Sequence, residues 1–272
     1  MSNVLLKLCD PVAFYDKFLA KSIYPDGRSI ESFCPISFKR GVSGGIGSSL
    51  VRQGGVTVSC SADANIMLKN DGQLVISNIE APSSVTQKTL NEITDLLDEL
   101  FSRDIIVSRD ELTCKGTEET VPLCWQITLN IRILNSDGCL SDAVIGAVAT
   151  TLMDIQLPFI ELKHSKDDEA PIEKEEIKIL PEKYNLEVLD FPVSSTFALY
   201  ESNSGPEKIS RLLCDPTAEL LDSCKVTCNV IMGKKGILLL RTRGSINDSS
   251  LIAQIVEWAE GRRKTVVKSF QH

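Results

Sequence analysis

The residues that most often carry enzymatic chemistry are scarce in this chain. It contains only two histidines. His164 opens a charged stretch and His272 is the last residue, and a buried general base is not expected at either place. This pattern argues against histidine-dependent hydrolases and against metal enzymes that use histidine ligands.

The nine cysteines are scattered along the chain, and no two of them form a C-x-x-C pair. The nearest pair, Cys224 and Cys228, lies in a segment that alternates like a strand, which would set the two side chains roughly 13 Å apart on one face. A zinc site there is one alternative. An odd number of cysteines, most of them within apolar stretches, favours reduced structural thiols instead. We therefore predict no metal site and no cofactor.

Two short segments resemble ligand-binding loops without meeting their requirements. Residues 41–47 are rich in glycine, but a strand is expected after them where a dinucleotide-binding loop needs a helix, and no P-loop lysine follows. Residues 137–142 begin and end with aspartate, but they lack the ligand number and the final glutamate of a calcium loop. A loop between two strands and a turn before a helix are the simpler interpretations.

Basic residues are the remaining candidates for binding. Lys234 falls in a charged turn, whereas Arg241 and Arg243 share one face of an expected strand. We predict that these three residues contact RNA. A basic cluster at residues 262–264 lies near the end of the last helix, where cations stabilise the helix dipole. For that cluster, a solvated helix end and a contact with a partner or RNA both stay open.

The elements that must position these residues run as strands and then a helix, in two halves. In the first half we expect helices over residues 10–20, 84–102 and 141–153 and strands over residues 36–40, 48–53, 56–64, 72–80 and 125–134. In the second half we expect strands over residues 192–200, 211–214, 224–232 and 237–243 and a closing helix over residues 247–270. The helix over residues 141–153 is almost entirely apolar, so it should be buried centrally. The order predicts an α/β (α+β) architecture of two β-sheet lobes with packed helices.

A charged stretch separates the two halves. Residues 163–178 are rich in Asp, Glu and Lys and contain a proline, which is typical of an exposed linker. We predict an N-terminal lobe with a leading helix over residues 1–162, a charged linker over residues 163–180 and a C-terminal lobe over residues 181–272.

Composition and charge restrict the class of protein. The chain has 272 residues, 43% of them hydrophobic, which is enough to form real cores. The first eight residues are too mixed for a signal peptide and no apolar run approaches the ~20 residues that cross a bilayer, so we expect a soluble intracellular protein. The net charge of −8 argues against strong independent RNA binding, although it allows a local basic stripe inside an assembly.

Five segments, in order, resemble the signatures of RNase PH-type subunits. They are Tyr24-Pro-Asp-Gly-Arg28 with Phe33, residues 47–60, residues 135–143, residues 191–198, and Asp215-Pro-Thr217. Tyr24 and Cys34 stand where the family's first two motifs usually have arginine. The resemblance covers about residues 10–265 and implies an RNase PH fold, a hexameric ring of six such lobes, and a central channel for RNA.

Within that family the chain is most similar to the ring subunits of the eukaryotic RNA exosome, of the Opa-interacting-protein type, because residues 10–19 lead directly into the Pro-Asp-Gly-Arg motif. The resemblance implies four kinds of partner: other RNase PH-like ring subunits, cap proteins, a hydrolytic nuclease, and RNA in the assembled channel. It implies a role in 3′→5′ RNA processing and degradation, including rRNA maturation and mRNA turnover, and a location in the nucleus, the nucleolus and the cytoplasm. No membrane partner is expected.

Active members of the family use phosphate to shorten RNA, and this needs cations around the phosphate and a nearby carboxylate. The resemblance places two arginines within residues 82–86 and a Gly-Ser/Thr-Arg motif at residues 138–141, but this chain has no arginine at either place. Asp190 matches the catalytic carboxylate, yet alone it would repel phosphate. We predict an inactive structural subunit with no catalytic residue. The alternatives are an active phosphate-dependent 3′→5′ exoribonuclease using Asp190, and a free-standing binding protein of the same fold.

Overall fold

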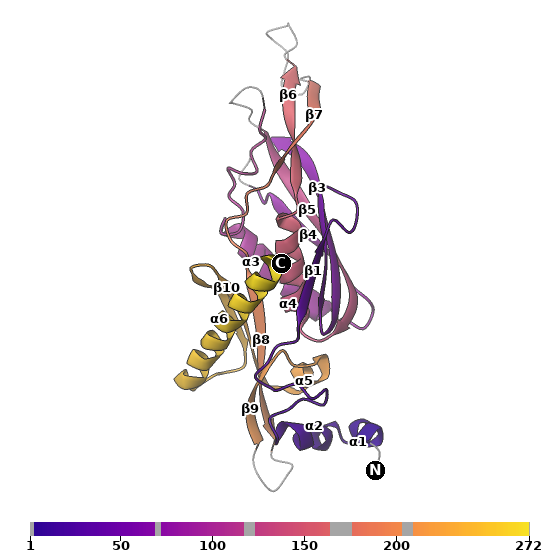
Figure 1. The fold of residues 1–272 in the computed structure, drawn as a ribbon, viewed down its shortest axis with the longest axis vertical. Coiled ribbons are helices and arrows are strands. Elements are labelled where there is room, and N and C mark those ends of the chain that lie inside the picture. Colours follow the sequence, from indigo (N-terminus) through magenta and orange to yellow (C-terminus); the bar gives the residue numbers. More distant parts are fainter. Residues whose placement is uncertain (1–2, 69–71, 117–122, 164–175, 203–208, 272) are drawn as a thin grey trace.

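The computed structural model describes residues 3–68, 72–116, 123–163, 176–202 and 209–271, and Figure 1 shows an elongated molecule with two main sheets along its length. The first sheet has the order β1-β2-β3-β5-β4 and is antiparallel except for β4 and β5. Its strands are β1 (Ile36–Arg40), β2 (Gly47–Gln53), β3 (Gly55–Leu68), β4 (Val75–Glu80) and β5 (Leu123–Asp137). The predicted strands are confirmed, and the glycine-rich residues 41–47 form mainly the loop between β1 and β2.

The second sheet is antiparallel, with the order β11-β10-β8-β9. Its strands are β8 (Val193–Ser202), β9 (Ile209–Cys214), β10 (Val226–Gly233) and β11 (Gly236–Arg243). The short helix α5 (Ala218–Ser223), which the sequence did not predict, follows β9, and the long closing helix α6 (Ser249–Gln271) packs on β8 and β10. Asp248 caps the start of α6, because its Oδ1 accepts from the Ser250 amide at 2.8 Å.

Helix α4 (Leu140–Leu152) lies between the two sheets, in contact with β2 and β3 on one side and β8 on the other. Almost every residue of α4 is buried, which confirms the prediction made from its apolar sequence. A helix that is apolar all round has no face for solvent, so packing between two sheets is the arrangement that satisfies it. This position also fixes the first turn of α4 at the junction of the two sheets.

Helix α3 (Gln87–Ser102) lies along β4 and buries Ile93, Leu96, Leu97 and Leu100 on one face. The helix expected over residues 84–102 starts later than its predicted first residue, Ser84. Thr86, and not Ser84, is the N-cap, because its Oγ1 accepts from the Thr89 amide at 3.2 Å. Ser84 instead contacts Ser136, with 3.2 Å between the two hydroxyl oxygens.

At the end of the molecule that carries the N-terminus, α1 (Asn3–Cys9) packs against α2 (Pro11–Leu19), and α2 contacts β9 (Figure 1). The helix expected over residues 10–20 is confirmed, and Asp10 is its N-cap, since Asp10 Oδ1 accepts from the Ala13 amide at 2.9 Å. Helix α1 was not predicted. The helices of the described residues are all too short or too polar to span a membrane.

At the opposite end, β6 (Gln156–Lys163) and β7 (Glu176–Asn185) form a separate two-stranded antiparallel sheet. Residues 176–180, predicted to belong to the linker, are therefore part of a strand, and the rest of that charged stretch, from residue 164 to residue 175, lies outside the described residues together with His164. The division into two lobes joined by a linker stays a prediction.

The cysteines are free thiols, and seven of the nine are buried. Cys224 lies in the apolar cluster beneath α2, whereas Cys228 lies in the cluster beneath α6. The two thiols of the pair considered for zinc therefore belong to different cores.

A candidate ligand pocket and the buried network beneath it

The first turn of α4 carries a buried carboxylate at the junction of the two sheets. Asp142 is only 2% exposed, and its Oδ2 accepts from Nη1 of Arg262, on α6, at 2.8 Å. The other donors to its carboxylate come from the second sheet: the hydroxyls of Ser194 and Thr196, the Thr196 amide, and Nδ2 of Asn229. A buried charge is stable only when paired and hydrogen-bonded. Asp142 therefore joins α4, the second sheet and α6.

A second buried aspartate extends this network to the first sheet. Arg262 Nη2 donates to Gln53 Oε1 at 2.8 Å, and Gln53 Nε2 donates to Asp215 Oδ1 at 3.0 Å. The backbone of Asp215 has a positive φ of 51°, an uncommon conformation outside glycine that aspartate tolerates better than most residues. The other carboxylate oxygen of Asp215 accepts from the Cys34 amide at 2.9 Å.

The Tyr24–Arg28 segment is hydrogen-bonded to the backbone of this aspartate and of the residue before it, Cys214. Tyr24 is 1% exposed, and its hydroxyl donates to the Cys214 carbonyl at 2.7 Å. Arg28 Nη2 donates to the Asp215 carbonyl at 2.9 Å, and its guanidinium lies 4.3 Å from the centre of the Tyr24 ring. Burial raises the pKa of Tyr24 far above its ordinary value, so the phenol stays a hydrogen-bond donor. We call the connected set Arg28, Gln53, Asp142, Asp215 and Arg262 the junction network.

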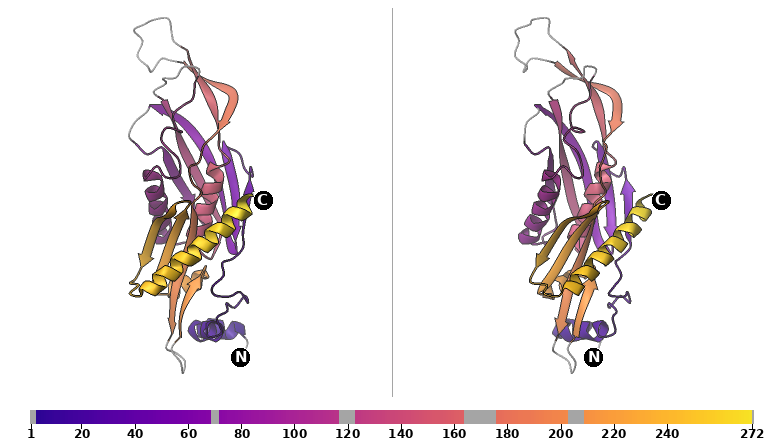
Figure 2. Two further views of the ribbon diagram at one scale, coloured as in Figure 1. Left: turned by 60° about the vertical axis from the view of Figure 1, so that its left-hand side comes forward. Right: turned by 90° about the vertical axis from the view of Figure 1, so that its left-hand side faces the viewer.

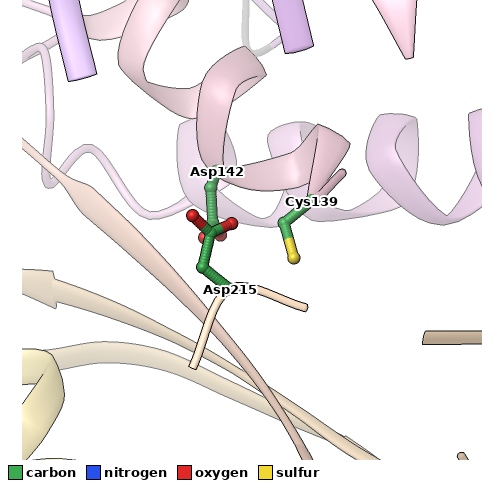
Figure 3. A group of neighbouring side chains, drawn as sticks. All are labelled: Cys139, Asp142 and Asp215. Atoms are coloured by element: carbon green, nitrogen blue, oxygen red, sulfur yellow. The ribbon is translucent and has the colours of Figure 1, made fainter. Parts of the chain in front are cut away.

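Figure 3 shows Asp142 and Asp215 pointing toward each other beside Cys139, and one ligand atom of each lies within 4.8 Å of the others. The donors already present do not suit a metal ion. Both carboxylates accept hydrogen bonds from arginine or amide groups, and burial raises the pKa of the Cys139 thiol well above its ordinary value. Metal binding needs a thiolate and free lone pairs. Cys139, Asp142 and Asp215 are therefore explained as part of the buried contact between the two sheets and α4, and not as a metal site.

On the outer side of the same turn lies a cavity of about 540 Å³, which we call the α4 pocket. It is bounded by the start of α3, the first turn of α4, α5, and the ends of β10 and β11 that lie away from their connecting turn. Residues 84–86 and residues 138–141 both line it. These are the two stretches where the family resemblance implies arginines, so the fold brings the two positions to one site.

The side chains at those two stretches are uncharged. Ser84 and Thr86 stand at the start of α3, while Cys139 is 2% exposed and its Sγ contacts the Pro216 carbonyl at 3.4 Å. Cys139 is the N-cap of α4 but makes no side-chain hydrogen bond to the helix. Hydroxyls and a protonated thiol can donate hydrogen bonds, but they cannot neutralise the charge of a phosphate group.

Arg241 and Arg243, predicted to contact RNA, do line the α4 pocket. Both are engaged within the protein. Arg241 donates to the Glu92 and Asp95 carbonyls of α3 and pairs with the Glu99 carboxylate at 2.9 Å. Arg243 Nη2 donates to the carbonyls that end α5, including that of Leu221 at 2.9 Å. These contacts hold α3 and α5 against the end of the hairpin, and RNA contact by either residue stays a prediction.

Lys234 lies apart from the two arginines. It is exposed at the turn between β10 and β11, whereas Arg243 pairs with Thr227 at the other end of the same hairpin. Over about seven residues of strand this separation is roughly 20 Å. The structure therefore does not bring the three predicted RNA contacts to one site.

Asp190 also lies outside the α4 pocket, at the same end of the hairpin as Lys234. Its Oδ2 accepts from the Lys234 amide at 2.7 Å, and its Oδ1 pairs with Arg263 at 3.3 Å. The catalytic role considered for Asp190 does not fit this geometry, because the carboxylate is held at a turn and does not line the α4 pocket. It fits the simpler interpretation, a polar residue just before a strand.

Sequence reasoning missed other charged residues of the pocket. Lys88 and Glu92 of α3 line the pocket, are exposed, and form an ion pair with 3.9 Å between Nζ and Oε1. Asp222 also lines the pocket with an exposed carboxylate. The i,i+4 spacing of Lys88 and Glu92 was visible in the sequence, but Asp222 lies on a helix that was not predicted. For the cluster at residues 262–264, a solvated helix end and a contact with a partner or RNA were both left open. The structure instead buries Arg262 against Asp142.

Comparison with known proteins finds a matching family model, similar sequences and similar solved structures. Residues 32–158 match the 3′ exoribonuclease family, domain 1, of RNase PH. A protein of Methanopyrus kandleri, "Exosome complex component Rrp42", is 24% identical over 237 residues, covering 82% of this chain and 80% of the relative. A protein of the same name from Methanothermobacter thermautotrophicus is 24% identical over 170 residues, covering 57% of this chain and 60% of that relative.

Solved structures share the whole fold. A chain of an archaeal exosome core superposes with a TM-score of 0.71 at 20% identity, covering 98% of both chains. A chain of the Archaeoglobus fulgidus exosome, determined with RNA bound to the active site, gives 0.72 at 20% identity and covers 97% of this chain and 99% of that one. Rice Rrp46 gives 0.60 at 12% identity, covering 91% and 95%. The chain thus has the RNase PH fold that its motifs predicted.

Proposed function

We propose that this chain is a structural, catalytically inactive subunit of an exosome-type ring, and that it supports 3′→5′ RNA processing and degradation without cutting RNA. The observation that carries the proposal is the α4 pocket. The two stretches where the resemblance implies phosphate-binding arginines lie together there, and neither contains a cation. A phosphate group entering the pocket would therefore meet hydroxyls where the chemistry requires positive charge.

The remaining charges of the pocket do not restore that site. Arg241 and Arg243 donate hydrogen bonds to carbonyls of α3 and α5, and Lys88 forms an ion pair with Glu92. Asp222 adds a negative charge next to the space where phosphate would sit. These contacts support a structural role for Arg241 and Arg243, in which they stabilise the fold and do not bind an anion.

The relatives support the assembly. Two curated relatives are named as exosome components, and the chain covers nearly all of a subunit from an exosome core. We propose other RNase PH-fold ring subunits as direct neighbours, with RNA passing through the assembled ring. We further propose the finer assignment, a eukaryotic ring subunit of the Opa-interacting-protein type that works with cap proteins and a hydrolytic nuclease in nucleus, nucleolus and cytoplasm.

A phosphorolysis assay tests the absence of activity. The purified chain is incubated with a 5′-labelled single-stranded RNA, magnesium and inorganic phosphate, and the release of nucleoside diphosphates is measured. We expect no release above that of a blank. Release that is abolished by Asp222→Asn would overturn the inactive assignment and place the chemistry in the α4 pocket. Asp190→Asn serves as the matched control, because that carboxylate lies at the other end of the hairpin.

An assembly assay tests the ring. The chain is co-expressed with RNase PH-fold exosome subunits from one organism and analysed by size-exclusion chromatography with light scattering. We expect co-elution at the mass of a hexamer or of a stable part of one. A chain that elutes alone in the presence of every such subunit would favour the free-standing binding protein of the same fold.

A further inference from the structure

A second cavity, of about 790 Å³, lies on the other side of the molecule's junction, between α6 and the segment that joins α2 to β1. Figure 2 shows this segment running beside α6 in both views. We call the cavity the α6 groove. It shares no lining residue with the α4 pocket, and neither the resemblance nor the proposed function uses it.

The floor of the α6 groove is apolar and firmly supported. Phe33 packs edge-on against the buried Phe197, with ring centres 5.6 Å apart, and the Arg262 guanidinium of the junction network lies 4.2 Å from the centre of the Phe33 ring. Trp258 and Val266 of α6 complete the floor, and Trp258 is partly exposed there. A rigid aromatic floor of this size is typical of sites that bind several side chains of a ligand.

The rim of the groove is acidic. Glu31 and Glu257 line it from opposite elements, both are exposed, and the described residues contain no recorded ion pair for either. A third carboxylate, Glu260, is paired with Lys264 at 2.8 Å. The Arg262 charge beneath the floor is already compensated by Asp142. A ligand in the groove therefore faces two uncompensated negative charges.

A glycine in the middle of α6 leaves open space along one wall of the α6 groove. Glycine destabilises a helix interior relative to alanine, so a buried contact usually explains its presence. At Gly261 no such contact exists among the described residues, because a Cβ there would meet no atom within 4 Å. Gly261 is exposed and lines the α6 groove, so the space beside it is open to a ligand.

We propose that the α6 groove binds a segment of another protein that places an arginine between Glu31 and Glu257 and lays apolar side chains on Trp258 and across Gly261. An arginine fits because its planar guanidinium both pairs with carboxylates and stacks on an indole face. RNA does not fit, because its phosphates would meet the acidic rim. The inference goes beyond the proposed ring function and does not rest on it.

The two tryptophans of the chain make the groove directly observable. Trp258 lines the groove, whereas Trp125 is 3% exposed in the core of the first sheet. In the full chain labelled with ¹⁵N, the two indole N–H signals are followed during titration with a blocked peptide of sequence GLRLLG, its GLELLG counterpart, oligo(A) RNA, and the protein itself at rising concentration.

We expect a saturable shift of the Trp258 signal with GLRLLG and none of the Trp125 signal, which reports that the fold is intact. The double variant Glu31→Gln/Glu257→Gln weakens this binding roughly three- to tenfold, since two exposed charge pairs are lost. Gly261→Gln, which fills the open space, abolishes it. Ala253→Gln, at an exposed position of α6 outside the groove, leaves it unchanged.

Four outcomes would overturn the proposal. They are no saturable shift with GLRLLG up to millimolar peptide, equal shifts with GLELLG, a stronger response to oligo(A), and a stronger response to protein concentration alone, which would identify a second copy of the chain as the occupant. None of them bears on RNA phosphorolysis or on co-elution with ring subunits, so failure here and failure of the proposed function are distinguishable.

Discussion

The first turn of α4 faces two regions, one where buried charges hold it to both sheets and one without the arginines that the resemblance implies. On its inner side Asp142 belongs to the junction network, where buried carboxylates meet arginines and amides at hydrogen-bonding distance. On its outer side Cys139 and Ser141 line the α4 pocket, where the charges expected from the family are absent. Cys139 and Ser141 on the outer side and Asp142 on the inner side belong to the same turn of α4.

The contrast explains which motifs the chain keeps. Arg28, Asp142 and Asp215 match the motifs of the resemblance, whereas Tyr24 stands where the family usually has arginine. Each of the four has a contact that holds the sheets and helices together. The positions that depart from the family at residues 82–86 and 138–141 face a cavity. The inner positions therefore stabilise the fold, whereas the arginines that the resemblance implies are missing at the cavity.

The largest expected effect is at the inner side. Arg262→Met removes the partner of Asp142 and leaves a buried carboxylate uncompensated, which should lower the free energy of unfolding by about 3–5 kcal/mol. Urea denaturation followed by tryptophan fluorescence measures it. Lys264→Met is the matched control, because the Lys264–Glu260 pair has the same 2.8 Å length on the same helix but is solvent-exposed. That variant should lose less than about 0.5 kcal/mol.

Equal losses in the two variants would contradict this account, because burial would then not distinguish the inner pair from a surface pair. A double variant that replaces both Asp142 and Arg262 by apolar residues sharpens the point. It should recover part of the loss, since the cost of the single variant comes from the unpaired charge.

A smaller effect is expected where Tyr24 joins the network. Tyr24→Phe removes the hydroxyl that donates to the buried Cys214 carbonyl, which should cost about 1–2 kcal/mol of unfolding free energy while leaving the ring packing intact. Differential scanning calorimetry measures the shift. A variant as stable as the natural chain would show that the carbonyl finds another donor and that Tyr24 contributes only through its ring.

Much of this fold follows from local sequence. The apolar run of α4 predicts a helix without a solvent face, and alternation and glycine turns predict most strands of both sheets. The junction network could not be predicted in the same way, because its members come from positions as far apart as Arg28 and Arg262 and meet only when both sheets pack on α4. Arg262 is adjacent to two other cations in the sequence, so its burial has no local signal.

The candidate site was predicted in part. The resemblance placed residues 82–86 and 138–141 in one function, and the structure places both in one pocket. The sequence gives no signal for where Asp190 lies relative to that pocket, since a carboxylate before a strand can lie at either end of a sheet. Likewise, Ser84 and Thr86 are both good N-caps, and the sequence does not choose between them. In the structure residues 82–85 form a turn, closed by the Val85 amide on the Pro82 carbonyl, and α3 starts after it at the Thr86 cap.

The start of α3 gives the third prediction, on the pocket side of the comparison. Thr86→Ala removes the cap of α3 and should cost about 1 kcal/mol of unfolding free energy. Ser84→Ala, two residues earlier in the same pocket, should change it by less than about 0.5 kcal/mol, because its hydroxyl meets only an exposed partner. Chemical denaturation compares the two variants. A larger cost for Ser84→Ala would mean that the outer side also contains a buried polar network.

The smallest expected effect concerns RNA and separates the two ends of the β10–β11 hairpin. In an assembled ring, Arg243→Gln and Lys234→Gln each remove one exposed cation. Lys234→Gln should change the unfolding free energy by less than about 0.5 kcal/mol, whereas Arg243→Gln also removes the donor to the Leu221 and Cys224 carbonyls and should cost about 1 kcal/mol. A residue that contacts an RNA phosphate should lower the slope of log affinity against log salt by about 1 when removed. Fluorescence anisotropy with labelled RNA measures the slope for each variant. Because the two residues lie at opposite ends of the hairpin, a changed slope for one alone would show which end faces the RNA. An unchanged slope for both would remove them as RNA contacts and leave the α4 pocket with arginines that serve the fold alone.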